Sequence, residues 1–260
     1  MISISLFLKN VLSAKDFMMN RNAQAFALLI AANQMLTMQK LQTSYWLKKQ
    51  CCTVNNTSRN DDGKTIGAII LAGGQSSRMK APKSWLPIQG NTTFIEQIAD
   101  TFHLALNGGV IAVLNGSYCI DEYEPLVQRL KLSTQVVPNH NPDLGRLHSI
   151  KLGLQHLHDD FVFIQNTDSP FLQVSTIEYL IEHARTGSVC IPVFNSQRGH
   201  PVLIETNWLR KVMDTAPENS TLRDLINTAE IIEVHVNDPA VLDNINSPEQ
   251  YEQLMHERVD

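Results

Sequence analysis

Residues 66–79 of the chain read IGAIILAGGQSSRM, an apolar run followed at once by two glycines and then by polar residues. The run 66–71 has the length of a strand and no polar position, which is typical of a parallel strand buried on both faces. Gly73 and Gly74 allow a sharp turn and let backbone N–H groups approach a ligand without an intervening Cβ. The stretch therefore predicts a buried strand that ends at a ligand-binding loop.

Similar apolar runs recur along the chain and alternate with helix-like stretches. The runs are 110–114, 135–137, 161–164 and 189–193, and the helix-like stretches are 94–106, 149–158 and 174–185. This alternation predicts an α/β fold, a doubly wound and mostly parallel sheet covered by helices on both faces. In such a sheet a ligand binds beyond the C-terminal ends of the strands.

Charge is distributed unevenly along the chain. Residues 1–60 hold seven Lys or Arg and one acidic residue, whereas the remainder holds 14 and 25. We therefore predict an N-terminal extension over 1–62 and one domain over 63–260, joined near the polar stretch 55–63. Three interpretations of the extension stay open: a non-functional or wrongly assigned start, a helix over 23–49 that docks on the domain, or a targeting peptide.

Composition indicates a soluble protein of the cytoplasm. The chain is 43% hydrophobic and 18% charged, which suits a globular domain with a sizeable core. No apolar run approaches the roughly 20 residues that span a bilayer. The spacing of the four cysteines (Cys51, Cys52, Cys119 and Cys190) fits neither a metal site nor a disulfide framework. We therefore expect reduced thiols.

Three cations follow the glycines, namely Arg78, Lys80 and Lys83. In an otherwise acidic domain they would give an anionic ligand a local positive site, and phosphate is the natural candidate. The alternative is an ordinary strand-to-helix turn with solvated cations. The spacing matches neither a Walker loop nor a dinucleotide-binding fingerprint, which disfavours classical NTPases and dehydrogenases.

The pattern LAGG-x-x-x-RM over 71–79, with Pro-Lys at 82–83 and Leu-Pro at 86–87, resembles the signature of the sugar-phosphate-type nucleotidyltransferases. It is most similar to the MobA-like branch, which contains the molybdenum cofactor guanylyl- and cytidylyltransferases. The resemblance runs from about residue 66 to 254 and implies the Rossmann-like fold of that superfamily. It departs at Lys80, where the family usually has glycine. It implies nucleotide binding by Leu71, Ala72, Gly73, Gly74, Arg78, Lys83, Gly145 and Ser149.

A carboxylate follows the predicted strand 161–164. Asp168 at such a point is often an N-cap or turn residue, but a carboxylate oxygen also suits Mg²⁺ shared with substrate phosphates. The resembled family has an Asp-x-Pro segment here whose Asp binds the metal, and Asp168 and Pro170 match it. The resemblance thus implies a Mg²⁺ cofactor and catalytic roles for Arg78, Lys83 and Asp168.

Residues 244–250 read NINSPEQ and match a second family motif. Taken locally, Ser247 is a good N-cap, Pro248 suits the first helical position, and Gln250 completes a capping box. The resemblance adds that Asn246 is a second metal ligand and that Asn244 lies near the acceptor.

Two further segments match less distinctively. The stretch 198–203, RGHPVL, resembles the family segment near the acceptor, so His200 either contacts the acceptor or is structural. The stretch 143–150 precedes a predicted helix where the family loop approaches the base and sugar. Gly145 and Ser149 fit that loop, whereas His148 is unexpected.

The sequence therefore predicts a nucleotidyltransferase that moves CMP or GMP from CTP or GTP to a phosphorylated small molecule and releases pyrophosphate. The resemblance implies the molybdenum cofactor as that acceptor. A sugar phosphate or alditol phosphate is the alternative acceptor, and a nucleotide-binding regulatory module without turnover is the alternative class. We expect neither a nucleic acid nor a membrane as a partner. The sequence cues for the base disagree, so C and G both stay open.

Overall fold

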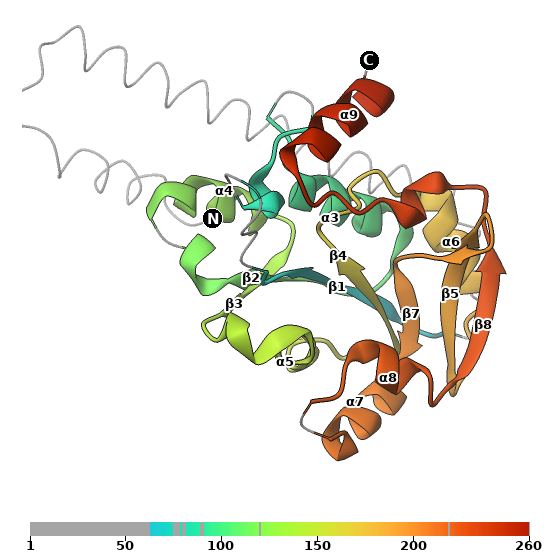
Figure 1. The fold of residues 1–260 in the computed structure, drawn as a ribbon. Helices are drawn as coiled ribbons and strands as arrows, with labels where there is room; N and C mark the ends of the chain where they lie inside the picture. Colours follow the sequence, from blue (N-terminus) through green and yellow to red (C-terminus); the bar gives the residue numbers. More distant parts are fainter. Residues whose placement is uncertain are drawn as a thin grey trace, which may run out of the picture. The chain divides into compact units, whose positions relative to one another are not determined.

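The computed structural model describes residues 63–74, 79, 82–88, 91–119, 121–217 and 219–259. The predicted extension, its boundary, and Cys51 and Cys52 lie outside the described residues and stay predictions. All five predicted strands are present, and they are β1 (Ile66–Ala72), β2 (Val110–Asn115), β3 (Gln135–Asn139), β4 (Phe161–Asn166) and β5 (Ser188–Phe194). Figure 1 shows them in one twisted sheet.

Three further strands extend this sheet, and the sequence patterns did not reveal them. They are β6 (Gln197–Arg198), β7 (Val202–Glu205) and β8 (Glu230–His235). The first two are too short for a recognisable run, and β8 interrupts its apolar residues with glutamates.

The sheet is mostly parallel, as predicted. Its order is β3-β2-β1-β4-β7-β5-β6, and β8 pairs with β5. The pairs β1–β2, β1–β4, β2–β3 and β5–β8 are parallel, whereas β7 runs antiparallel to both β4 and β5. The C-terminal ends of the first four strands therefore meet at one edge.

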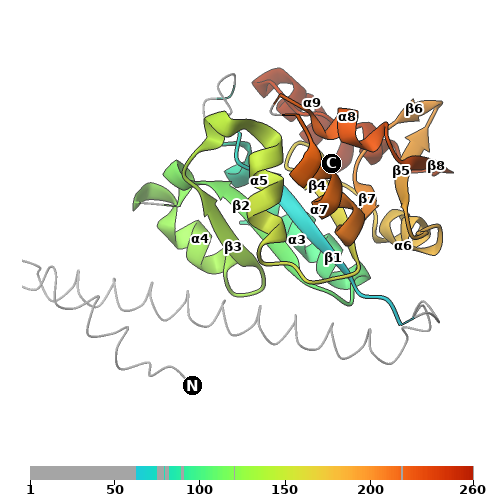
Figure 2. The same cartoon turned by 90° about the horizontal axis from the view of Figure 1, so that it is seen from below.

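Helices cover both faces of the sheet (Figures 1 and 2). One face carries α3 (Phe94–Ala105), α4 (Glu124–Leu130) and α6 (Val174–Glu182), and the other carries α5 (Gly145–Leu154), α7 (Thr206–Thr215) and α8 (Leu222–Ile226). The last helix is α9 (Pro248–Val259). This is the doubly wound arrangement that alternating strands and helices predict.

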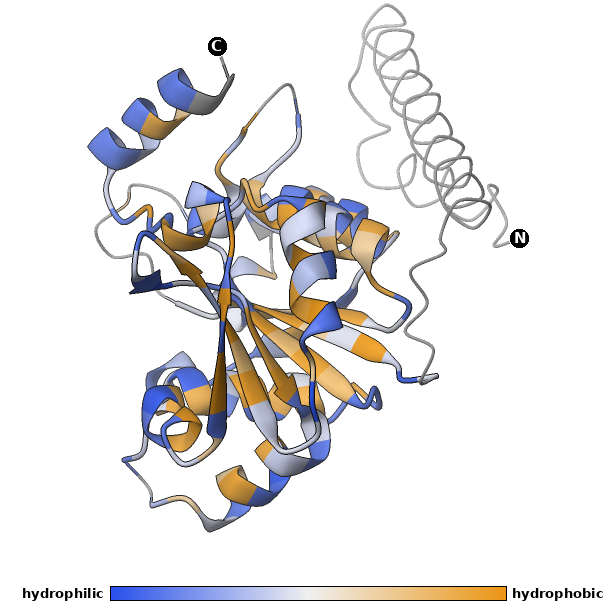
Figure 3. Ribbon diagram, turned by 90° about the vertical axis from the view of Figure 1, so that its right-hand side faces the viewer, coloured by the Kyte–Doolittle hydropathy of each residue, from blue (hydrophilic) through white to orange (hydrophobic). Residues whose placement is uncertain are grey.

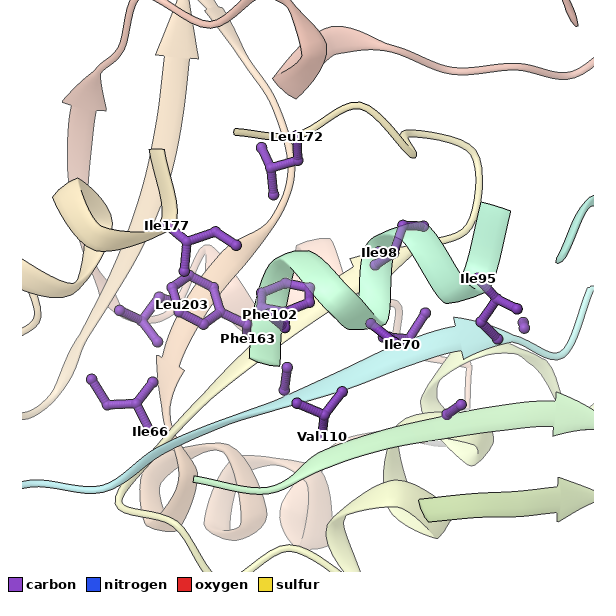
Figure 4. Close-up of a cluster of buried hydrophobic side chains, with 14 of the residues drawn as sticks. Ile66, Ile70, Ile95, Ile98, Phe102, Val110, Phe163, Leu172, Ile177 and Leu203 are labelled. Carbon is purple, nitrogen blue, oxygen red and sulfur yellow. The ribbon is translucent and has the colours of Figure 1, made fainter. Parts of the chain in front are cut away.

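Strand β1 shows why a continuous apolar run is needed at the centre of the sheet. Ile66 and Ile70 pack toward α3 and α6 with Phe102, whereas Ile69 and Leu71 pack toward α5 on the other face. Figure 4 shows the first of these clusters, and Figure 3 shows the apolar strands between the two helix layers. Burial on both faces removes apolar surface from water, and this stabilises the fold by about 25 cal/mol for each Å² that is buried.

The prediction for the second helix was wrong by one turn, because 149–158 was expected and α5 spans Gly145–Leu154. Its start lies in a polar stretch, where Gly145 has a φ of 82° at the end of a short 3-10 turn. Its end is fixed from outside, since the guanidinium of Arg210 donates hydrogen bonds to the carbonyls of Leu154 (2.5 Å) and Leu157 (2.6 Å). No apolar pattern encodes either event.

No helix in the described part of the chain is long and apolar enough to cross a bilayer. Cys119 and Cys190 are both free thiols, which agrees with the expectation for these two residues.

Candidate active site

A cavity of about 420 Å³ opens at the C-terminal edge of the sheet. Eight residues predicted for the site line it, and they are Leu71, Ala72, Gly73, Gly74, Lys83, Gly145, Ser149 and Asp168. Its other lining residues are Ser84, Pro142, Arg146, Asn166 and Thr167. Residues up to 97 positions apart thus surround one space, because parallel strands end at the same edge. Arg78 and Lys80, which the sequence also singles out, lie outside the described residues.

Gly73 is needed where β1 ends, because another chain segment approaches closely. A Cβ on Gly73 would lie 3.0 Å from Oγ of Ser149, which is tighter than ordinary contact. That hydroxyl is fixed in turn, since Nδ2 of the fully buried Asn139 donates to it at 3.0 Å. Asn115 also donates from Nδ2 to the Gly73 carbonyl at 3.4 Å. The loop is therefore attached to the ends of β2 and β3.

Asp168 is half-buried just after β4. Burial raises the pKa of its carboxyl, and the positive charges of Lys83 and Arg146 act against that rise. Withdrawal from water disfavours a carboxylate unless cations compensate. Asp168 thus sits where an additional cation would be stabilised.

Lys83 comes from a 3-10 turn, η1 (Lys83–Trp85), and reaches the motif that precedes α9. Its Nζ donates to Oδ1 of Asn246 at 2.5 Å. The amide of Asn246 is oriented by its own Nδ2, which donates to Oδ1 of Asn244 at 2.6 Å. The backbone N–H of Ile245 donates to the Asp168 carbonyl at 3.1 Å, so this motif and the end of β4 are joined. Lys83 and Asp168 line the cavity, and these hydrogen bonds link them to the motif that contains Asn244 and Asn246. The two asparagines do not line the cavity themselves.

The local interpretation of the following residues is confirmed. Helix α9 begins at Pro248, and Oε1 of Gln250 accepts from the N–H groups of Asn246 (2.7 Å) and Ser247 (3.2 Å). The capping arrangement fixes the backbone immediately after Asn246.

His200 does not line the cavity. Burial, aided by the positive charge of Arg146, lowers the pKa of its imidazole to about 4, so the ring is neutral near pH 7. Its backbone N–H donates to the carbonyl of Val241 at 2.9 Å. Among the described residues its buried Nδ1 has no hydrogen-bond partner. Like His200, His148 is not among the cavity-lining residues.

Three polar residues of the site escaped the sequence interpretation: Arg146, Asn139 and Asn115. The two asparagines end β3 and β2, and a polar residue closing an apolar strand is the signal that could have found them. Arg146 follows Gly145 and donates from Nη2 to Oδ1 of Asn166 at 2.7 Å. Arg146 could have been found from the sequence because it is a cation within the stretch 143–150, which resembles the nucleotide loop of the family.

The donor set fits a hard divalent cation in part. Asp168 offers a carboxylate as a metal ligand. Asn246 offers its amide oxygen Oδ1, which accepts a hydrogen bond from the ammonium of Lys83 and thus already interacts with a positive charge. Nowhere in the described ranges do three His, Cys, Asp or Glu residues gather as a metal-binding group. Mg²⁺ commonly takes one or two protein oxygens and completes its shell with phosphates and water. The residues therefore suit a metal that arrives with a phosphate ligand.

The fold and this edge cavity define a doubly wound α/β protein with a glycine-loop site. Residues 68–234 match the model of the MobA-like NTP transferase domain, and the chain belongs to that family.

Similar proteins agree with this assignment. The chain is 29% identical over 131 residues to a probable molybdenum cofactor guanylyltransferase of Bacillus cereus, a match that covers 50% of this chain and 62% of that protein. It is 26% identical over 207 residues to a protein of the same name from Flavobacterium johnsoniae, covering 74% and 97% of the two chains. A nucleotidyl transferase from Methanothermobacter shares the fold with a TM-score of 0.63 and 21% identity, covering 75% and 99%.

Proposed function

We propose that the chain is a nucleotidyltransferase that moves the nucleotidyl group of GTP to a phosphorylated acceptor and releases pyrophosphate. The observation that carries this proposal is the convergence of Gly73, Lys83 and Asp168 on one cavity at the C-terminal edge of the sheet. The names of its curated relatives favour the guanylyl group, with CTP as the alternative donor. They also favour molybdopterin of the molybdenum cofactor as the acceptor.

The Gly73-Gly74 loop would receive the nucleotide. Gly73 brings backbone close to Ser149 and Asn139, and Gly145 begins α5 at the same cavity. The first N–H groups of a helix favour an anion, so the α5 N-terminus adds to the positive potential of Lys83. Arg78 would join this set as the second cation of the loop. These groups hold a triphosphate without covalent chemistry.

The reaction needs positioning more than acid–base help. An oxygen of the acceptor phosphate attacks the α-phosphorus, a new P–O–P link forms, the bond to the β-phosphate oxygen breaks, and pyrophosphate leaves with the electron pair. An acceptor phosphate that is already ionised has no proton to give up. Holding two anions together is the main cost, and cations placed in advance reduce it.

Asp168 and Asn246 would hold Mg²⁺, with Asp168 as the stronger ligand because it carries the charge. When bound, the metal neutralises charge on the phosphates as pyrophosphate departs. Lys83 steadies the same charge from the loop side. Asn166 and Thr167 line the cavity next to Asp168 and add polar side chains to its lining.

Pyrophosphate release tests the proposal. The full chain is incubated with Mg²⁺, each of the four NTPs, and either molybdopterin or a panel of sugar and alditol phosphates. We expect release with GTP and molybdopterin, and a loss of roughly 100-fold or more in Asp168→Ala. The matched control is Asp214→Ala, an exposed carboxylate on α7.

Release with sugar phosphates instead of molybdopterin would reject the acceptor. Nucleotide binding without release under any condition would show a binding module rather than an enzyme. Unchanged turnover in Asp168→Ala would reject the metal-assisted mechanism.

A further inference from the structure

Arg146 is a second cation at the cavity, and the roles proposed so far do not use it. Among the described residues the cavity lining contains two cationic side chains, Lys83 and Arg146. They come from different elements, since Lys83 belongs to η1 after the glycine loop and Arg146 to the first turn of α5. Both charges favour ionised Asp168. Two cations beside one carboxylate suit a reaction that brings two phosphorylated substrates together.

The guanidinium of Arg146 reaches the end of β4. Its Nη2 donates to Oδ1 of Asn166, the last residue of β4. Asn166 pairs with Leu71 of β1, so the guanidinium lies on the β4 side of the glycine loop. The hydrogen bonds that attach Gly73 to Asn115 and Ser149 to Asn139 lie on the other side, toward β2 and β3. Although its backbone belongs to the predicted nucleotide loop, the charged head of Arg146 thus lies over β4.

The start of β7 lies on the other side of β4 from β1. The antiparallel pairing of Ile164 with Val202 places His200 near the end of β4, on the side opposite β1. The charge of Arg146 is felt there, because it contributes to the lowered pKa of His200. Because the imidazole of His200 is neutral, it adds no positive charge to that of Arg146.

The donors of Arg146 are available to a ligand. The residue is exposed to the cavity, and its one hydrogen bond with the described residues uses a single N–H of the five that a guanidinium carries. The planar fork of arginine matches two oxygens of a phosphate, and such paired charge-assisted bonds are among the stronger ones.

We propose that Arg146 binds the phosphate of the acceptor at the boundary of β4 and β7, while Lys83 serves the triphosphate. This assignment rests on the proposed function and names the part of the site that holds the second substrate. The acceptor phosphate would lie beside Asp168, between the guanidinium and the α-phosphate that it attacks.

Binding of inorganic phosphate tests the assignment without knowledge of the acceptor. The full chain is first saturated with Mg²⁺ and a non-hydrolysable GTP analogue, so that the triphosphate positions are filled. Phosphate is then titrated calorimetrically. We expect Arg146→Gln to weaken phosphate binding roughly 10- to 100-fold while the affinity for the GTP analogue changes less than about threefold. Arg146→Lys should recover part of the loss because it restores the charge without the fork.

Lys151→Gln is the matched control, an exposed cation on the same helix outside the cavity lining. Equal phosphate affinity in Arg146→Gln and the original chain overturns the assignment. Weakened GTP-analogue binding with unchanged phosphate binding also overturns it, because Arg146 would then belong to the nucleotide. If the original chain shows no pyrophosphate release, the proposed function fails on its own, and the phosphate titration still reports whether Arg146 binds a second anion.

Discussion

The Nζ atom of Lys83 donates a hydrogen bond of 2.5 Å to Oδ1 of Asn246, across 163 positions of sequence. Asn246 is the proposed second metal ligand, and the same ammonium charge lowers the pKa of Asp168 against the effect of burial. In the free protein, Lys83 therefore stands where a divalent cation would find its protein oxygens. When a triphosphate binds, its negative charge would attract the ammonium of Lys83 in place of Asn246.

Lys83→Met should consequently tighten the binding of Mn²⁺ to the nucleotide-free protein, by roughly tenfold, because an ammonium no longer competes for Asn246 or repels the ion. The same variant should bind GTP more weakly. Electron paramagnetic resonance of free Mn²⁺ measures the first effect and equilibrium dialysis the second. Lys211→Met, on the exposed surface of α7, should change neither. Weaker Mn²⁺ binding in Lys83→Met would contradict the competition.

Gly73→Ala should lower the free energy of unfolding by about 1–3 kcal/mol, because the new Cβ meets Oγ of Ser149 at 3.0 Å. Ser149 cannot give way freely while Asn139 holds it. Urea unfolding measures the change. Gly74→Ala is the matched control, since no atom lies within 4 Å of a Cβ there. Adding Ser149→Ala to Gly73→Ala should recover part of the loss, and an equal loss in both backgrounds would contradict the contact.

His200 should make the protein less stable as the pH falls from about 6.5 to about 4. The folded state lowers the pKa of its imidazole to about 4 from 6.5, so in this window the unfolded chain binds a proton that the folded chain excludes. The raised pKa of Asp168 acts in the opposite direction at acid pH, so the comparison must be made between variants. The unfolding free energy of His200→Gln, measured by urea titration at several pH values, should depend less steeply on pH in this window. A parallel dependence in both proteins would show that His200 does not contribute.

Arg210→Met should destabilise the protein by roughly 1–3 kcal/mol, because the carbonyls of Leu154 and Leu157 lose a charged donor at the end of α5. Amide hydrogen exchange should show faster opening around 154–157. Arg223→Met on α8 is the control, as an exposed arginine at the surface. Protection that is unchanged in Arg210→Met would mean that α5 ends there for another reason.

The sequence by itself determined the central strands, the doubly wound class and most of the cavity lining. Both faces of strand β1 are buried, so every position of the strand must be apolar or small. The resulting continuous apolar run can be recognised in the sequence without a structure. Gly73 and Asp168 were found for the related reason that the polar or glycine position ending such a run marks the edge where ligands bind.

Only the tertiary structure decided which side chains meet at that edge. The limits of α5 depend on the φ of Gly145 and on Arg210 from another helix, and β7 is too short to carry a pattern. The pairing of Lys83 with Asn246, and the reach of Arg146 to Asn166, join residues that no periodicity relates. Local patterns record which residues must be buried, whereas long-range contacts between polar side chains follow from where the packed elements place them.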